Sequence, residues 1–518
     1  MLASIKPLIV VLIFATLVYR VVTPIALKFS SESDFFRRRN VWFILTITAM
    51  LSPSFWLFVL VAVPLLIAAG RKDRNPVALY LLLLHVVTPV QIDIPFVGIE
   101  SLFGLDIYRL LSLCVLIPAA WRYRSARRTA AAPSGFGAPD FFLIASGLLI
   151  VALYVPADLP GHVLQPDSLT NMLRRAFLFV IDAYVVYFTI SRWSSNRQLI
   201  AEALAAYCVS CAIMAVLALF ETAWGWKLYA HMAETWTGNA RASYYLLRGT
   251  HLRAEVSTRH ALALAYLLAV AFGFWLYLKS RVPSVWARIA GICVYWAGLL
   301  VTYSRGPWIG AASILMVFTV LRPRALSRLL KTAAAIAIGF GAVLVSPLGD
   351  QILSVLPWMG GSVGSDTLLY RQRIAQRSWH LIASHPFLGD QLALLKMEDL
   401  RQGEGIIDLV NTYATVALFY GLVGLFAFLA FILIPAFRAY LATRRVAQSD
   451  PDLALLGASL IACTAGTLVM LADSSFILAY QQMFYVLAGL TAAYARLGQV
   501  PAPQPRAASE LAPMQQQR

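Results

Sequence analysis

One stretch of the chain gathers side chains that could bind an anion. It runs from Leu369 to Pro386, where any helix should end because the residue before a proline is pushed out of the α region. Read as a helix, the stretch places Arg373, Arg377 and His380 at i, i+4 and i+7, so they form one cationic stripe. A separate apolar stripe, able to pack against a membrane or a helix bundle, consists of Tyr370, Ile374, Leu381 and Ile382.

More arginines occur in the two longest hydrophilic connections. Residues 224–259 and 348–408 contain, besides the stripe, Arg241, Arg248, Arg253, Arg259, Arg371 and Arg401. A guanidinium suits phosphate because its planar fork donates two parallel hydrogen bonds and never deprotonates. The two connections therefore predict an anion site, although solvated charges in contact with lipid headgroups would give the same pattern.

Arg305 interrupts an apolar stretch, residues 285–321, that is long enough for two membrane spans. The sequence Ser304-Arg305-Gly306-Pro307 is typical of a tight turn between such spans. An arginine near apolar depth costs roughly 2.5–3.5 kcal/mol on insertion scales, so it is expected to have a partner or a task. We expect the turn to place Arg305 at the membrane surface beside the two connections.

Composition indicates what positions these groups. Sixty per cent of the 518 residues are hydrophobic and 13% are charged. The chain contains repeated apolar runs, each long enough as a helix to cross about 30 Å of hydrocarbon. The expected fold class is all-α, a polytopic transmembrane helix bundle of about 12–14 spans with two extracytoplasmic loops, the larger containing short helices. Residues 1–496 would form this domain, and residues 497–518, whose end is rich in Pro, Ala and Gln, a disordered cytoplasmic tail.

The expected spans are approximately residues 7–27, 41–69, 76–93, 103–121, 140–156, 173–191, 200–223, 260–278, 285–303, 307–321, 330–347, 409–434, 453–472 and 476–494. Lys and Arg gather in alternate connections, which include residues 70–75, 122–128, 192–197, 279–288, 322–331 and 438–445. The positive-inside rule then puts both termini in the cytoplasm and the loops 224–259 and 348–408 outside.

One connection fits this topology badly. Residues 28–40 should face outward, yet they contain Arg37-Arg38-Arg39. Residues 41–69 form either one tilted span or a hairpin around Pro53, whose two halves are short for a crossing. The sequence leaves both alternatives open.

The cysteines predict no disulfide or metal site. All five lie in apolar runs, and Cys208 and Cys211 have CxxC spacing without a second pair or a nearby histidine. We interpret them as small packing residues. The outer segments lack a cluster of His, Asp and Glu at ligand spacing, so no metal or cofactor is expected. The net charge of +17 is spread over short loops, which favours membrane topology over nucleic-acid binding.

Three motifs, spread over roughly residues 240–430, resemble those of the O-antigen ligase and O-antigen polymerase superfamily, membrane glycosyltransferases of bacterial surface polysaccharides. They are Ser304-Arg305-Gly306-x-Trp308-x-Gly310; Arg371 through Trp379 to His385-Pro386-Phe387-Leu388-Gly389; and Asn411-x-Tyr413 followed by Tyr420-Gly421-Leu422-Val423-Gly424-Leu425. Leu252-Arg253-Ala254 is similar to the segment around the family's other periplasmic arginine. The order, spacing and shared side of the motifs carry the resemblance.

The sequence departs from the family pattern at one position. Many members have a histidine just before the asparagine of the third motif, as a catalytic base or substrate anchor, and here that residue is Val410. Either the base is less essential in this branch, or another group replaces the histidine, the candidates being Asp408, Glu404, His380 and His385. The departure favours a polymerase-type member slightly over a ligase.

The resemblance implies an enzyme, and the lack of a metal-ligand cluster in the outer segments predicts that it is metal-independent and has no cofactor. It would polymerise or ligate glycan repeat units from a polyprenyl-pyrophosphate-linked donor onto an acceptor sugar at the periplasmic face of the bacterial inner membrane. The implied partners are this donor, a glycan acceptor, membrane lipid and other polysaccharide assembly proteins, and they include no nucleic acid. The alternative is a transporter or flippase of lipid-linked oligosaccharide, for which internal repeats and midplane charges are typical.

These considerations select twelve site residues. The expected catalytic residues are Arg253, Arg305, Arg371 and Asp408. The expected substrate-binding residues are Arg248, Arg259, Arg373, Arg377, His380, His385, Asn411 and Tyr413.

Overall fold

The chain folds into a bundle of apolar helices. The computed structural model describes residues 2–95, 101–128, 136–153, 168–238, 247–248, 251–323, 325–345, 365–401, 407–476 and 478–498. Within these residues, six helical segments are long and apolar enough to cross a membrane: Ser4–Ala26, Phe55–Lys72, Arg197–Trp224, Ala261–Arg281, Thr412–Val446 and Pro451–Leu471. The predicted all-α polytopic class is confirmed.

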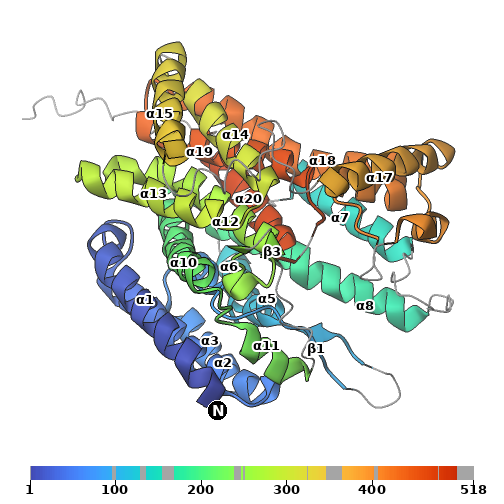
Figure 1. The fold of residues 1–518 in the computed structure, drawn as a ribbon, viewed down its shortest axis with the longest axis horizontal. Helices are drawn as coiled ribbons and strands as arrows, with labels where there is room; N and C mark the ends of the chain where they lie inside the picture. The colour runs from blue at the N-terminus through green and yellow to red at the C-terminus, as the bar shows by residue number, and fades with distance from the viewer. Residues whose placement is uncertain are drawn as a thin grey trace, which may run out of the picture.

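Helices account for most of the described chain (Figure 1). In the first half they are α1 (Leu2–Ala26), α2 (Glu32–Leu51), α3 (Phe55–Lys72), α4 (Pro76–Leu83), α5 (Ile107–Leu111), α6 (Ile117–Arg128), α7 (Ala138–Ala152), α8 (Leu169–Phe179), α9 (Val185–Trp193) and α10 (Arg197–Trp224). In the second half they are α11 (Ala230–Thr237), α12 (Ala261–Leu278), α13 (Val285–Leu300), α14 (Arg305–Val320), α15 (Ala325–Val345), α17 (Ser365–Ser384), α18 (Thr412–Val446), α19 (Pro451–Leu471) and α20 (Leu478–Leu497).

Short elements complete the chain. The π-helical turns η1 (Ser112–Leu116) and η2 (Val180–Tyr184) join α5 to α6 and α8 to α9. The 3₁₀ turns are η4 (Val256–Thr258), η5 (Lys279–Arg281) and η7 (Ala393–Leu400). Strand β1 (Ile92–Asp93) pairs antiparallel with β2 (Gly104–Leu105), and β3 (Leu247–Arg248) pairs antiparallel with β4 (His251–Leu252).

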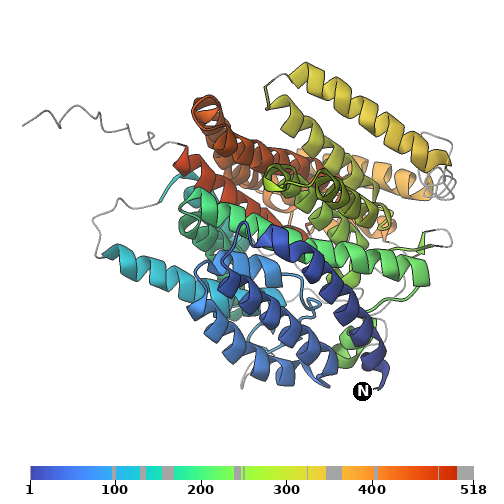
Figure 2. The same ribbon diagram turned by 90° about the vertical axis from the view of Figure 1, so that its left-hand side faces the viewer.

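Helix α12 lies at the centre of the bundle. The apolar part of α12 is 94% buried, against 28% for α1. Helix α1 lies at the left-hand edge in Figure 1 and at the front of the molecule in Figure 2. Helices α10, α13, α14 and α19 surround α12. Tyr266 of α12 stacks on Tyr480 of α20 with ring centroids 4.0 Å apart. The end of α12 that begins at Ala261 is therefore held rigidly, which matters because the candidate site surrounds it.

The structure resolves the open alternative at residues 41–69 in favour of a hairpin. Helix α2 ends at Leu51, Pro53 lies in the turn, and the Ser54 side chain caps α3 by accepting from Leu57 N. Helix α2 has 20 residues because it begins at Glu32 rather than near residue 41, so a segment expected to be a loop belongs to the helix. Its first turns are charged, and α2 is not among the six apolar segments named above. The expected span 76–93 also differs, since α4 ends at Leu83.

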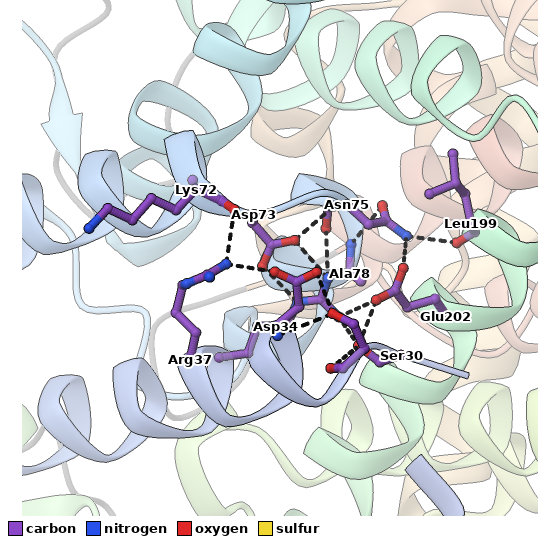
Figure 3. Close-up of polar contacts among 12 residues, drawn as sticks. Ser30, Asp34, Arg37, Lys72, Asp73, Asn75, Ala78, Leu199 and Glu202 are labelled. Atoms are coloured by element: carbon purple, nitrogen blue, oxygen red, sulfur yellow. Dashed lines mark hydrogen bonds and ion pairs between the residues drawn. The ribbon is translucent and has the colours of Figure 1, made fainter. Parts of the chain in front are cut away.

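A buried polar cluster explains how α2 accommodates its arginines. Arg38 donates from Nε and Nη2 to Asp73, both at 2.7 Å, and from Nη1 to Glu202 at 2.8 Å. Asn75 donates to the second Glu202 oxygen at 3.0 Å. Figure 3 shows Asp73 and Asn75, from the turn between α3 and α4, converging with Glu202 of α10. Because a buried charge is stable only when paired, this cluster fixes residues 37–39 beside residues 71–74.

The α2–α3 turn lies at the other end of the hairpin. There the indole Nε1 of Trp236, in α11, donates to Ser52 O at 3.1 Å, and the Trp236 ring packs on Phe55 and Phe58. The turn thus contacts the connection 224–259, whereas Arg38 contacts the start of α10. The arginine-rich segment 28–40 therefore lies at the same end of the bundle as the other basic connections. Its arginines no longer conflict with the positive-inside rule.

Candidate functional site

Arg253 is held against the segment that leads into Arg305. Its guanidinium donates from Nε to Thr302 O at 3.2 Å and from Nη2 to Ser304 Oγ at 3.0 Å. The neighbouring Ala254 N donates to Val301 O at 3.3 Å, which joins the two backbones. Burial lowers the pKa of Arg253, and Glu255 opposes this shift, yet a guanidinium remains charged. Two expected catalytic arginines, far apart in sequence, are therefore neighbours.

Asp473 brings Arg371 to the same place. It lies in the turn between α19 and α20, and its Oδ1 forms an ion pair with Arg371 Nη1. Arg305 is close enough to be repelled by Arg371 and attracted by Asp473. A Cβ added at Gly306 would collide with Asp473 Oδ2, so the glycine of the first motif permits this approach. Sequence analysis missed Asp473, although an acid between the last two apolar runs was a usable signal.

Asp408 is oriented by the same turn. Its Oδ1 accepts from Ser475 Oγ at 2.6 Å and from Val410 N at 3.2 Å. Thr412 Oγ1 donates to Ser474 O at 2.7 Å, which ties the start of α18 to that turn. Within the described residues Oδ2 of Asp408 has no hydrogen-bond partner. The carboxylate is thus fixed by one oxygen and keeps the other available.

His260 is a further residue that sequence analysis missed. It precedes α12 as its N-cap, and its Nδ1 is buried without a hydrogen-bond partner in the described part of the chain. Burial lowers the pKa of His260 to about 4, nearby Arg253 adds to the shift, and Asp408 opposes it. The imidazole is therefore neutral at neutral pH. Its place between a basic loop and an apolar run was a sequence signal.

The backbone around these groups is strained. Four described residues other than glycine have φ between 45° and 56°, namely Val256, Arg259, Tyr303 and Val410. Each lies in the segments that carry Arg253, Arg305 and Asp408. Such conformations cost roughly 1–3 kcal/mol each and persist only where surrounding contacts impose them. One such contact is Glu221, whose Oε2 accepts from Glu255 N at 3.1 Å and Val256 N at 2.9 Å.

The cationic stripe of α17 lies apart from this cluster. The apolar stripe packs inward as expected, with Ile374 buried and Tyr370, Leu381 and Ile382 partly buried around it. Arg373 and His380 are exposed, and Arg377 donates to Lys396 O at 3.1 Å on the surface. His385, also exposed, lies 3.0 Å through Nδ1 from Ser384 Oγ.

The remaining expected site residues have varied positions. Asn411 caps α18 by accepting from Ala414 N at 3.0 Å, and Tyr413 donates to Leu468 O at 2.6 Å. Burial lowers the pKa of Arg259, with Glu255 opposing. Arg248 lies in strand β3, and Glu404 lies outside the described residues.

Two of the sequence motifs interlock and thereby position α17. Leu422 N donates to Pro386 O at 2.7 Å, and Asp390 N donates to Leu418 O at 2.7 Å. Gly389 and Gly421 have φ of 71° and 66°, and a Cβ on either would collide with the backbone of the other motif. The close approach of the two backbones explains both glycines, which let the segment after α17 pack against a break in α18 and so position the helix that carries Arg371.

Part of the chain is similar to a known protein family. Residues 290–429 match the family model described as O-Antigen ligase. The match includes Arg305, Arg371 and Asp408, but it ends before Asp473 and begins after Arg253 and His260. No curated protein matches the chain.

Proposed function

We propose that this chain, whose residues 290–429 match the O-Antigen ligase family model, transfers a glycan from a polyprenyl-pyrophosphate-linked donor to an acceptor sugar. The observation that carries the proposal is the cluster of Arg253, Arg305 and Arg371 from three separate segments. A transporter would not need three guanidiniums gathered at one end of the bundle.

The arginines would act on the leaving group. When the bond to the anomeric carbon breaks, negative charge grows on the pyrophosphate that departs with the lipid. Fixed guanidiniums directed at those oxygens stabilise the transition state more than the ground state, and this lowers the barrier. Asp473 currently neutralises part of the cluster, so the donor pyrophosphate would compete with this carboxylate for Arg371.

Asp408 would act on the acceptor. The attacking hydroxyl must lose its proton as its oxygen bonds to the anomeric carbon, and a positioned carboxylate can take that proton. Ser475 orients Oδ1 of Asp408, which leaves Oδ2 for the hydroxyl. The neutral imidazole of His260, close to Asp408, is a second group that can accept a proton. Among the base candidates considered from the sequence, Asp408 fits this role best because His380, on α17, and His385, directly after it, are exposed.

A transfer assay tests the proposed activity. We expect the purified chain, supplied with a lipid-pyrophosphate glycan and an acceptor sugar, to form the longer glycan in the presence of EDTA, because arginines replace a divalent ion. Activity that EDTA abolishes and Mg²⁺ or Mn²⁺ restores would contradict the metal-independent mechanism. Movement of intact donor across proteoliposomes without transfer would favour the flippase alternative instead.

The α2–α3 hairpin changes the proposed topology. If both helices cross, residues 28–40 lie in the cytoplasm with the other basic connections, and the start of α1 lies outside, contrary to the expected cytoplasmic N-terminus. The site and the connection 224–259 remain outside. In a Cys293→Ser background, an impermeant thiol reagent should label Pro53→Cys in intact spheroplasts, and Ser33→Cys only after permeabilisation. Identical behaviour of the two positions would contradict the hairpin crossing.

Gly306→Ala should impair the enzyme without unfolding it. The added methyl group would displace Asp473 and with it Arg371, and a shift of about 1 Å in a catalytic group can cost about 100-fold in rate. The matched control is Gly339→Ala in α15, where a Cβ would meet no atom within 4 Å. Product should be measured at equal membrane abundance. Equal product from the two variants would show that the approach of Asp473 to α14 is unimportant.

A further inference from the structure

A cationic cleft lies between α1 and α2, two helices that carry none of the candidate site residues. It has a volume of about 420 Å³, and its polar lining consists of Thr16, Tyr19, Arg20, Thr23, Arg39 and Asn40. Two guanidiniums therefore face one space from two helices. In the part of the chain that the structure describes, no carboxylate lines this cleft.

Polar groups in the cleft lack the partners that they need. Arg20 is exposed on an apolar helix and has no hydrogen-bond or ion-pair partner among the described residues. The hydroxyl of Tyr19, a residue only 2% exposed, likewise has no partner there. Among the described residues, Arg39 contacts only the side-chain oxygen of Asn40, at 3.1 Å through Nη2, and the ring of Phe36. An arginine in a membrane helix is costly unless an anion compensates it.

The position of the cleft indicates the source of that anion. Arg20 and Arg39 each lie about 10 Å along their helices from the α1–α2 turn. With this turn at the membrane surface, both guanidiniums would lie at the level of the lipid headgroups. From Arg20 toward the membrane centre, α1 carries an apolar stripe of Ile9, Ile13 and Leu17, each more than half exposed. A headgroup phosphate in the cleft would leave its acyl chain along this stripe.

We propose that the α1–α2 cleft binds the phosphate of an anionic phospholipid. The two guanidiniums bind the phosphate oxygens, the Tyr19 hydroxyl donates to one of them, and the acyl chain covers the stripe on α1. The lipid belongs to the leaflet at the α1–α2 turn, which is the end of the bundle with the basic connections. The site is independent of the glycan-transfer site and requires no glycan.

Native mass spectrometry of the purified full chain from nanodiscs with equal amounts of phosphatidylglycerol and phosphatidylcholine tests the proposal. The unaltered chain should retain phosphatidylglycerol preferentially. Arg20→Gln and Arg39→Gln should each lower that preference about fivefold, since a cation near an anionic headgroup contributes about this factor. The control Arg74→Gln removes an exposed charge at the same end of the bundle, outside the cleft, and should leave the preference unchanged.

Four results would overturn the proposal. The first is equal retention of the two lipids by the unaltered chain, which needs no variant to fold. The second is a lack of effect that is specific to the cleft. This would be an unchanged preference in the variant that carries both Arg20→Gln and Arg39→Gln, or a loss in Arg74→Gln as large as in the cleft variants, which would reflect total charge. The third is displacement of the lipid by millimolar inorganic phosphate, which would indicate a site for free anions. The fourth is retention of a polyprenyl phosphate in place of the phospholipid.

Discussion

Arg305→Ala and Arg371→Ala should each lower product formation about 10²–10³-fold, the typical cost of losing one preorganised donor to a developing charge. Their lysine variants should fail nearly as badly, because lysine keeps the charge but loses the planar fork that binds two oxygens. Arg253→Ala should behave alike, but it also breaks the contacts to Thr302 and Ser304. The measurement is polymer or ligation product in a deletion strain that expresses each variant at equal membrane abundance.

Arg401→Ala is the matched control for these variants. It removes the same charge from the same long connection, but its described ion pair is with Glu398, at 2.7 Å, rather than with any group of the arginine cluster. We expect near-normal product. Normal product from Arg305→Ala or Arg371→Ala would break the pyrophosphate model, and loss from Arg401→Ala alone would mean that other cations carry the chemistry.

Asp408→Asn should lower the transfer rate about 10²–10⁴-fold, the usual contribution of a general base. The amide has the shape of the carboxylate, and its oxygen can still accept from Ser475 and Val410, so the loop should keep its conformation. The loss would then report on the proton acceptor rather than on folding. Initial rates at saturating donor, with binding of the donor measured separately, distinguish a slower chemical step from weaker binding.

Ser475→Ala provides the intermediate case for this prediction. It leaves the Asp408 carboxylate in place but removes its 2.6 Å hydrogen bond, so the loss should be smaller than in Asp408→Asn. Near-normal rates in Asp408→Asn would exclude this carboxylate as the base. The neutral His260 would then become the group to test, by His260→Gln.

Local sequence was sufficient for several elements of the site. The turn at Ser304 between α13 and α14 follows from a polar interruption in an apolar stretch, and the end of α17 at Ser384 follows from the proline two residues later. The apolar stripe around Ile374 also packs inward as its spacing predicts. These features depend on residues within one or two helical turns, so no tertiary information was needed.

Long-range pairing decided the rest. Arg38 can lie inside α2 only because Asp73 and Glu202 reach it from other helices, so its local sequence indicated a loop. Asp473 belongs to the site only because the turn after α19 folds onto Gly306 and Arg371. The sequence by itself therefore determined a helical membrane protein and the motifs that carry its candidate arginines. Only the tertiary structure decided which charges meet, because the free energy of a buried charge depends on partners that are distant in sequence.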